Sequence, residues 1–335
     1  MSTSTLASEV DATVSTIPTI FDPSTCTRRG LCPVTKIKNE GSPLESHSLY
    51  FEQHGTGPEK IVFIMGLNAT LFAWTQQVEH FGRKPEYSIL VFDNRGVGNS
   101  GSPRGPYTTG EMADDIVVLL DYVGWNTPRD LHVVGVSMGG MIAQELASRI
   151  PERIVSLTLG ATKTGGSSYW SMVPTWRSVV GFGRMLLTRD RVAKISIAVN
   201  DLFPQRWLDA KANNDPRGRT NREVQLESLR RRIDITRPQT LMGSVSQVAA
   251  ALSHNVEPVR LRTISESIPK VLIVTGDEDV IVDPSNSLYL KEHMPEAEYV
   301  LWEGTGHGLM AQWPEKFNQL LERVFKEGRD RIQGS

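Results

Sequence analysis

The stretch LHVVGVSMGGMIAQELAS, residues 131–148, decides the fold of this chain. It opens with the short, β-branched apolar run Leu131–Val136, which is typical of a strand covered on both faces. The residues from Met138 to Ser148 have high helix propensity. Between the two lies Gly135-Val136-Ser137-Met138-Gly139, a G-x-S-x-G pattern at a strand–turn–helix junction. The stretch therefore predicts a buried strand, a sharp turn that carries Ser137, and a helix.

The turn has a steric logic. A serine between a strand and a helix is held in a strained backbone conformation, and neighbours without side chains let the two arms approach each other. Gly135 and Gly139 provide that room. The helix N-terminus directs free N–H groups and partial positive charge towards the serine hydroxyl. We interpret Ser137 as a candidate nucleophile and the N–H of Met138 as an oxyanion donor; the alternative is an ordinary turn serine.

Short apolar strands alternate with amphipathic helices on both sides of this stretch. Strands are expected at residues 31–38, 47–54, 60–65, 87–92, 131–136, 154–160, 270–275 and 298–302. Helices are expected at 71–82, 109–123, 138–148, 283–293 and 312–326. The first two strands suggest an antiparallel edge pair. The alternation predicts an α/β fold, a mostly parallel eight-stranded sheet with helices on both faces.

The alternation stops at about Lys163 and resumes at Lys270. Arginine, tryptophan and helix formers dominate the interval, and no strand is evident in it. We predict a helical cap at 163–261, inserted into a core domain made of 31–162 and 262–330. Residues 1–30 are expected to form a disordered tail, with a structural arm as the alternative.

Composition narrows the function. A formal charge of −2 argues against a dedicated nucleic-acid binder, and no run of 18 apolar residues predicts a membrane span. The first 20 residues lack the features of a targeting signal, so a cytoplasmic location is expected. Cys26 and Cys32 are expected to be idle thiols, a disulfide being the alternative. No His, Cys and carboxylate cluster with ligand spacing is evident, and the glycines at 96 and 98 form no dinucleotide fingerprint, so neither metal nor cofactor is expected.

Five motifs stand in a recognisable order: IMGLN at 64–68, FDNRGVGNSG at 92–101, GVSMGG at 135–140, VTGDEDVIVDP at 274–284 and GTGHG at 304–308. Together they resemble the α/β-hydrolase fold superfamily, in particular its capped serine esterase and lactonase branch. The likeness covers roughly residues 45–328 and is weakest across the cap. It implies the α/β-hydrolase fold and the chain order nucleophile, acid, histidine.

A serine hydroxyl needs a base to become a good nucleophile, and His307 is the candidate. Gly304, Gly306 and Gly308 surround it in a loop that follows the last strand, so its ring can reach over the sheet. The imidazole needs a carboxylate to hold its tautomer. The resemblance selects Asp279, the third residue after Gly276, and leaves Asp277 as the alternative.

An oxyanion hole needs two N–H groups. The resemblance adds the N–H of Leu67 to that of Met138. The sequence departs from the family here, because many relatives carry His where this chain has Met65. The backbone donor does not depend on that side chain, but the hydrogen bonding of the loop must differ.

Other polar residues are interpreted as structural. Asp93 and Arg95 are expected to hold the backbone of the loop in which they lie, and Asp114 and Asp115 to occupy an exposed helix face. His254 closes the predicted cap and could line a pocket.

The predicted function is a serine hydrolase that cleaves a small to medium carboxylic ester or lactone through an acyl-enzyme, with water as the second substrate. An acyltransferase, a carbon–carbon bond hydrolase and a ligand-binding receptor with a retained triad are the alternatives. Specificity is expected to reside in the cap. The candidate pocket walls, each of which could instead pack a small helical core, are Trp74, Trp170, Trp176 and Phe203.

Overall fold

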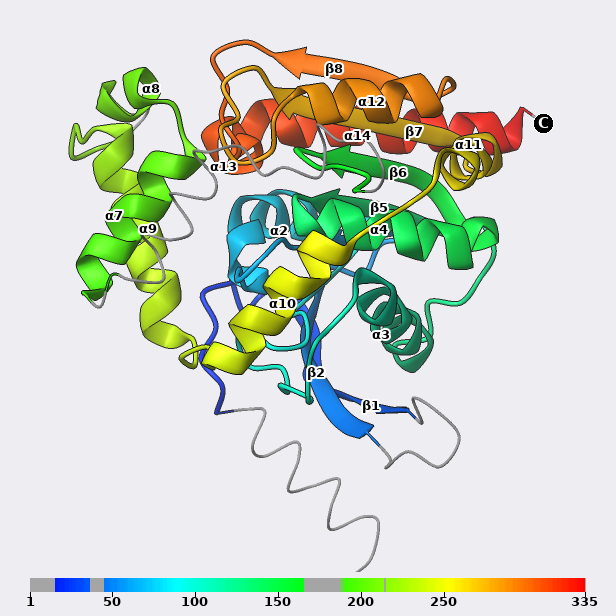
Figure 1. The fold of residues 1–335 in the computed structure, drawn as a ribbon, viewed down its shortest axis with the longest axis horizontal. Coiled ribbons are helices and arrows are strands. Elements are labelled where there is room, and N and C mark those ends of the chain that lie inside the picture. Colours follow the sequence, from blue (N-terminus) through cyan, green and yellow to red (C-terminus); the bar gives the residue numbers. More distant parts are fainter. Residues whose placement is uncertain (1–15, 37–44, 166–187, 189, 214, 335) are drawn as a thin grey trace, which may run out of the picture.

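The computed structural model contains one eight-stranded sheet with helices on both faces (Figure 1). The structure describes residues 16–36, 45–165, 188, 190–213 and 215–334. The strand order is β1-β2-β4-β3-β5-β6-β7-β8. Strands β1, β2 and β4 pair antiparallel, and every pairing from β4 to β8 is parallel. The predicted fold, a mostly parallel eight-stranded sheet with an antiparallel edge, is confirmed.

The strands are β1 (Cys26–Lys36), β2 (Glu45–His54), β3 (Glu59–Ile64), β4 (Tyr87–Phe92), β5 (Leu131–Val136), β6 (Ile154–Gly160), β7 (Lys270–Gly276) and β8 (Glu298–Trp302). The helices are η1 (Leu71–Trp74), α2 (Thr75–Gly82), α3 (Thr109–Tyr122), α4 (Met138–Arg149), η2 (Pro151–Arg153), α7 (Arg191–Leu202), α8 (Gln205–Asp209), α9 (Asn221–Ile235), α10 (Leu241–Ser253), α11 (Pro258–Ser267), α12 (Ser285–His293), α13 (Leu309–Gln312) and α14 (Pro314–Gln333). Among these helices none is both long and apolar enough to cross a membrane.

The core has two layers, one on each face of the sheet. Because side chains alternate along a strand, Val133 of β5 joins the cluster under α3, α4 and α11, whereas Val134 joins the cluster under α2 and α14. All residues of β5, β6 and β7 are buried. This two-sided burial explains why these strands read as continuous apolar runs rather than as alternating ones.

Helices α7, α8 and α9 lie to one side of the sheet (left in Figure 1) and share a small apolar cluster of their own. Its buried members are Val199, Phe203 and Leu208, and Ala311 of α13 packs against it. These three helices lie within the residues 163–261 predicted to form a cap. Residues 166–187 of the predicted cap, which include Trp170 and Trp176, lie outside the described residues.

Helices α10 and α11 pack on the sheet domain. Gln247 of α10 is fully buried and donates to the carbonyl oxygen of Arg95 over 2.8 Å. Leu261 and Ile264 of α11 belong to the main core. The division into core and cap remains a prediction, but its expected boundary at residue 261 cuts through α11.

The N-terminal segment corrects the prediction of a disordered tail to residue 30. Strand β1 begins at Cys26 and pairs with β2 along its length. Ahead of it, the ring of Phe21 is 3% exposed and packs against Phe72 and His54. Burial of this apolar ring against the sheet is stabilising, and it holds the N-terminal segment in place.

A buried ion pair corrects a second prediction. Asp115 of α3 is 2% exposed, not solvated as expected, and its carboxylate accepts two hydrogen bonds from Arg95, Nε–Oδ2 2.6 Å and Nη2–Oδ1 2.5 Å. Burial pushes the pKa of Asp115 upwards, but the hydrogen bonds from His47 and Arg95 outweigh it and hold the pKa below its ordinary value. Its neighbour Asp114 pairs with Arg149 at the surface.

We predict a large difference between substitutions at these adjacent aspartates. Asp115→Ala leaves the buried guanidinium of Arg95 without its bidentate partner, and should lower the free energy of unfolding by about 3–5 kcal/mol. Asp114→Ala removes a surface pair and should cost less than about 1 kcal/mol. Urea unfolding at neutral pH measures both. Equal values for the two variants would contradict a structural role for the buried pair.

Candidate active site

Ser137 lies between β5 and α4 with φ 59° and ψ −127°, a conformation rare for residues other than glycine. The glycines around it are required by close backbone contacts. A Cβ on Gly139 would lie 2.1 Å from the carbonyl oxygen of Ile64, and one on Gly135 would lie 2.3 Å from the carbonyl oxygen of Gly139. A side chain at either glycine would therefore collide with the backbone, as the G-x-S-x-G pattern predicts.

The backbone of Ser137 is tied to the neighbouring strand, while its hydroxyl is not. Its N–H donates to the carbonyl oxygen of Gly160 over 2.9 Å, and the hydroxyl of Thr162 donates to the carbonyl oxygen of Ser137 over 2.7 Å. The Oγ of Ser137 makes no hydrogen bond to any residue that the structure describes, His307 included. The residue as a whole is partly exposed.

Asp279 and His307 form a buried pair. Asp279 follows β7, His307 follows β8, and each is 5% exposed. The distance from His307 Nδ1 to Asp279 Oδ2 is 2.7 Å. The other carboxylate oxygen of Asp279 accepts the N–H groups of Ile281 and Val282 at 2.8 and 2.9 Å. These bonds fix the orientation of the carboxylate towards the imidazole.

Asp277, the alternative acid, does something else. Its Oδ1 accepts the N–H of Thr305 over 3.2 Å, and its own N–H donates to the carbonyl oxygen of Trp302. The side chain therefore connects the loops after β7 and β8 instead of contacting the imidazole. Of the two candidates, the structure places Asp279 beside His307.

The strand order brings the three predicted residues to one edge of the sheet. Strands β5, β6, β7 and β8 are consecutive parallel neighbours, so their C-terminal ends lie together. Ser137 follows β5, Asp279 follows β7 and His307 follows β8. Ligands of open α/β sheets bind at this carboxyl edge.

The loop after β3 lies directly against Ser137. A Cβ on Gly66 would be 2.9 Å from the Cβ of Ser137. The N–H groups of Leu67 and Met138 have no hydrogen-bond partner among the described residues. Asn94 donates to the carbonyl oxygen of Met65, and Gln247 accepts the N–H of Asn68. These two amide side chains hold the loop that, in this chain, has Met65 in place of His.

The predicted pocket walls fall in different places. Trp74 is fully buried between the rings of Phe63 and Phe317, at centroid distances of 4.7 and 6.5 Å. The indole has no exposed surface, so the prediction that it lines an open pocket is wrong. Phe203 is 6% exposed, and its ring lies 2.6 Å from where a Cβ on Gly308 would be, next to His307 in sequence.

Sequence reasoning missed Gln312, which holds the histidine loop. Its amide oxygen accepts the N–H of Gly306 over 2.9 Å, and its amide nitrogen donates to the carbonyl oxygen of Gly304 over 2.8 Å. The side chain is 3% exposed. A single glutamine in a helical stretch does not indicate such a role in the sequence. The role is evident only in the structure, where the N–H of Gly306 and the carbonyl of Gly304 both bond to its amide.

His254, considered as a possible pocket residue, is a buried neutral base. It is 3% exposed, and its Nδ1 lies 2.8 Å from the hydroxyl of Thr109. Burial lowers the pKa of His254 to about 4. The charge of Glu145 acts in the opposite direction, and the charges of Lys163 and Arg260 lower the pKa further.

We predict that His254 makes the fold acid-sensitive. The unfolded chain binds a proton at this histidine near its ordinary pKa of about 6.5, while the folded protein resists protonation down to about 4. Its contribution to stability is therefore complete above pH 6.5 and is lost as the pH falls to 4, by about 3 kcal/mol. Urea unfolding of wild type and His254→Asn across this range measures it. The difference between the two proteins should shrink with acid; a constant difference would contradict the prediction.

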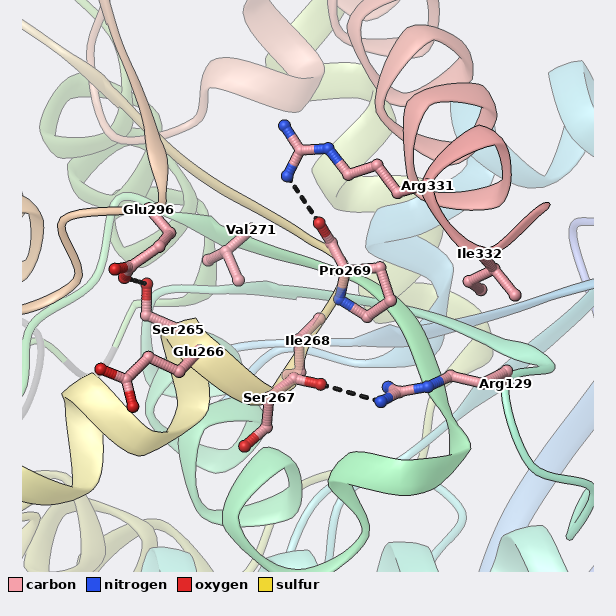
Figure 2. A pocket seen from close by; sticks show the side chains of 10 residues that line it. All are labelled: Arg129, Ser265, Glu266, Ser267, Ile268, Pro269, Val271, Glu296, Arg331 and Ile332. Atoms are coloured by element: carbon pink, nitrogen blue, oxygen red, sulfur yellow. Dashed lines mark hydrogen bonds between the residues drawn. The ribbon is translucent and has the colours of Figure 1, made fainter. Parts of the chain in front are cut away.

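The structure also has a cavity of about 410 Å³ at the other end of β7 (Figure 2). Arg129, Ile268, Pro269 and Arg331 are among its lining residues. Both guanidinium groups donate to backbone carbonyls, Arg129 to Ser267 and Arg331 to Pro269. The seven residues of β7 separate this cavity from Asp279 by about 20 Å. It is therefore not part of the candidate active site.

One group of potential metal ligands occurs among the described residues, formed by Cys26, Glu52 and His54. The three residues stand at 26, 52 and 54, a spacing that does not indicate a metal site from the sequence alone. The three side chains belong to β1 and β2, on the antiparallel edge of the sheet, whereas Ser137, Asp279 and His307 follow β5, β7 and β8.

Comparison with known proteins agrees with this architecture. The family model of the alpha/beta hydrolase fold matches residues 60–312. A candidate carbamate hydrolase, RutD, of Azorhizobium caulinodans is 27% identical over 82% of this chain and 93% of its own length. The 3-oxoadipate enol-lactonase 2 of Acinetobacter baylyi is 27% identical over 79% of this chain and 88% of its own. A thermophilic esterase of Thermogutta terrifontis superimposes with a TM-score of 0.68 at 22% identity, covering 90% of this chain and 99% of that one. The chain belongs to the α/β-hydrolase fold family.

Proposed function

We propose that this protein is a serine hydrolase that cleaves a carboxylic ester or lactone of small to medium size through an acyl-enzyme. The observation that carries the proposal is the buried hydrogen bond between His307 and Asp279, at the same sheet edge as the strained Ser137. A nucleophile, a base and a group that orients the base are the parts that acyl transfer requires.

The proposed acylation step rests on the hydrogen bond between His307 and Asp279 and on a contact between His307 and Ser137 that forms as the substrate binds. Asp279 accepts the Nδ1–H of His307, which leaves the lone pair on Nε2 to act as the base. Nε2 takes the proton of the Ser137 hydroxyl as Oγ forms a bond to the substrate carbonyl carbon. His307 then gives that proton to the departing alkoxide oxygen, and the C–O bond breaks. A lactone opens in the same step, with its hydroxyl still attached to the acyl group.

The negative charge that develops on the carbonyl oxygen needs donors that are already in place. The N–H groups of Leu67 and Met138 flank Ser137 and have no partner among the described residues, which suits this role. Each such donor typically contributes about 10²–10³ in turnover. Deacylation repeats the sequence with water, whose proton His307 takes before the acid is released.

The substrate site is proposed to lie between the histidine loop and the cap. Gly308 donates to the carbonyl oxygen of Leu202 over 2.9 Å, so α7 ends directly beside the loop of His307. Phe203 is therefore proposed as an apolar wall of the acyl or alcohol pocket. Trp170 and Trp176 remain predictions on the part of the cap outside the described residues.

The relatives suggest which substrates to test first. One is named as an enol-lactonase and one as a candidate carbamate hydrolase, and both reactions use attack on an acyl carbon. The panel should therefore contain esters, lactones, carbamates and acyl-thioesters. An added alcohol acceptor tests acyl transfer, and a vinylogous diketone tests carbon–carbon bond cleavage.

A fluorophosphonate probe tests the nucleophile independently of substrate choice. We expect the wild type to be labelled at Ser137, found by peptide mass spectrometry, and to turn over at least one ester or lactone. Binding of panel compounds with a raised melting temperature but without turnover or labelling would instead favour a receptor. Labelling at a different serine would overturn the proposal.

A further inference from the structure

Three side chains with metal-binding atoms meet on the antiparallel edge of the sheet, and the proposed hydrolysis uses none of them. Cys26 of β1 pairs directly with His54 of β2, and Glu52 lies two residues before His54 on the same face of that strand. The strand register shifts just after Cys26. As a result, one ligand atom from each of the three residues lies within 4.8 Å of the other two.

The hydrogen bonds around His54 decide which ring nitrogen has a free lone pair. The hydroxyl of Thr25 donates its proton to the carbonyl oxygen of Asp22 over 2.8 Å, so it must accept from His54, whose Nδ1 is 2.9 Å away. Nδ1 therefore carries the proton of the neutral ring, and Nε2 presents a lone pair. A histidine that binds a metal likewise donates its other ring N–H to an oxygen acceptor, which fixes the tautomer and the orientation of the ring.

That lone pair has no partner. His54 is fully buried, and its Nε2 has no hydrogen bond, although buried polar atoms are usually paired. The nearest acceptor is the Oε2 of Glu52 at 3.6 Å, too far for a hydrogen bond. Glu52 is also fully buried, and its carboxylate accepts from the hydroxyls of Tyr50 and Thr19. A buried carboxylate therefore faces a buried ring nitrogen that has no hydrogen bond.

We propose that Cys26, Glu52 and His54 bind a divalent transition-metal ion, with Zn²⁺ the best match, and that water completes the coordination. Thiolate, imidazole and carboxylate are the ligand set that Zn²⁺ prefers. Bond lengths of about 2.0–2.2 Å to nitrogen and oxygen place two tetrahedral ligands about 3.4 Å apart. The separation of 3.6 Å between His54 Nε2 and Glu52 Oε2 is close to that value.

The bound ion would fasten the N-terminal segment to the sheet. The segment already contacts the site through three residues: Thr19 donates to Glu52, Phe21 packs on the ring of His54 at 4.9 Å, and Thr25 accepts from that ring. A bond from the metal to Cys26 would link the start of β1 to Glu52 and His54, the two residues that the segment already contacts. The role is structural and does not depend on the proposed hydrolase activity.

Cobalt spectroscopy tests the site directly. The full-length, untagged protein is stripped with a chelator and titrated with Co²⁺, and thiolate-to-cobalt charge-transfer absorption is recorded in the near ultraviolet. The chain has two cysteines, so the band can be assigned to one of them. We expect the band in wild type and in the matched control Cys32→Ala, its loss in Cys26→Ser, and an affinity lower by more than about tenfold in Glu52→Gln.

Thermal unfolding supplies a second readout. Zn²⁺ at about 100 times its dissociation constant should raise the Tm of wild type by a few degrees and leave that of Cys26→Ser unchanged. Equal far-ultraviolet circular dichroism spectra of the two proteins show that both are folded. A wild type without the thiolate band, a band that persists in Cys26→Ser, or the same Zn²⁺ effect on both proteins would overturn the proposal.

Discussion

Ser137→Ala is expected to lower kcat/KM for the best ester or lactone by about 10⁴- to 10⁶-fold, the range seen when a hydrolase loses its nucleophile. Only the hydroxyl is removed. The Cβ stays, so the strain at φ 59° is the same in both proteins. Because the Oγ of Ser137 makes no hydrogen bond to any described residue, the free energy of unfolding should change by less than about 0.5 kcal/mol.

The loss is measured by initial rates on wild type and variant under identical conditions, with urea unfolding in parallel. Ser148→Ala is the matched control, since Ser148 lies on the same helix, is exposed, and bonds only to the carbonyl oxygen of Gln144 through its hydroxyl. That variant should keep full activity. If Ser137→Ala retained more than about a hundredth of wild-type turnover, a different nucleophile would have to be sought.

The parts of the molecule that sequence reasoning predicts well are those set by local physics. The apolar runs of β5, β6 and β7 reflect burial on both faces, which each strand records in its own residues. The turn at Ser137 is likewise local, because Gly135 and Gly139 are required within five residues of each other.

The errors arise where a side chain depends on residues far away in the sequence. Asp115 occupies a helix position that the sequence pattern predicts to be exposed. It is buried in an ion pair with Arg95, which lies twenty residues earlier in the chain. The residue type of Trp74 predicts a pocket wall, but its position between Phe63 and Phe317 depends on a strand and on the last helix. Patterns of residue type do not encode such partners.

The group of Cys26, Glu52 and His54 is also not predictable from spacing along the sequence. Glu52 and His54 share a strand face, a spacing common in any amphipathic strand. Cys26 joins them only through the register of β1 against β2, and that register shifts just after it. No spacing rule along one chain detects this arrangement. For the candidate catalytic residues, by contrast, the glycines around His307 predict that residue, and the family resemblance selects Asp279 with Asp277 as the alternative.

Asp279→Asn should reduce kcat by about 10⁴-fold, with little change in stability. The Oδ1 of the new amide can still accept the N–H groups of Ile281 and Val282, so the loop keeps its shape. Its NH₂ group then points at Nδ1 of His307. An amide donor forces the imidazole to place its proton on Nε2, and that tautomer cannot take the proton of Ser137.

Asp277→Asn is the matched comparison, because it makes the same chemical change two residues earlier. Its amide oxygen can still accept the N–H of Thr305, so activity should fall less than about tenfold. Steady-state rates of both variants decide between the two candidate acids: a large loss at 277 with a small one at 279 would reverse the assignment. The double variant of Ser137→Ala with Asp279→Asn should be no slower than Ser137→Ala alone, because residues that act as one unit lose their effect together. Additive losses would mean that Asp279 supports turnover by a route that does not pass through the serine.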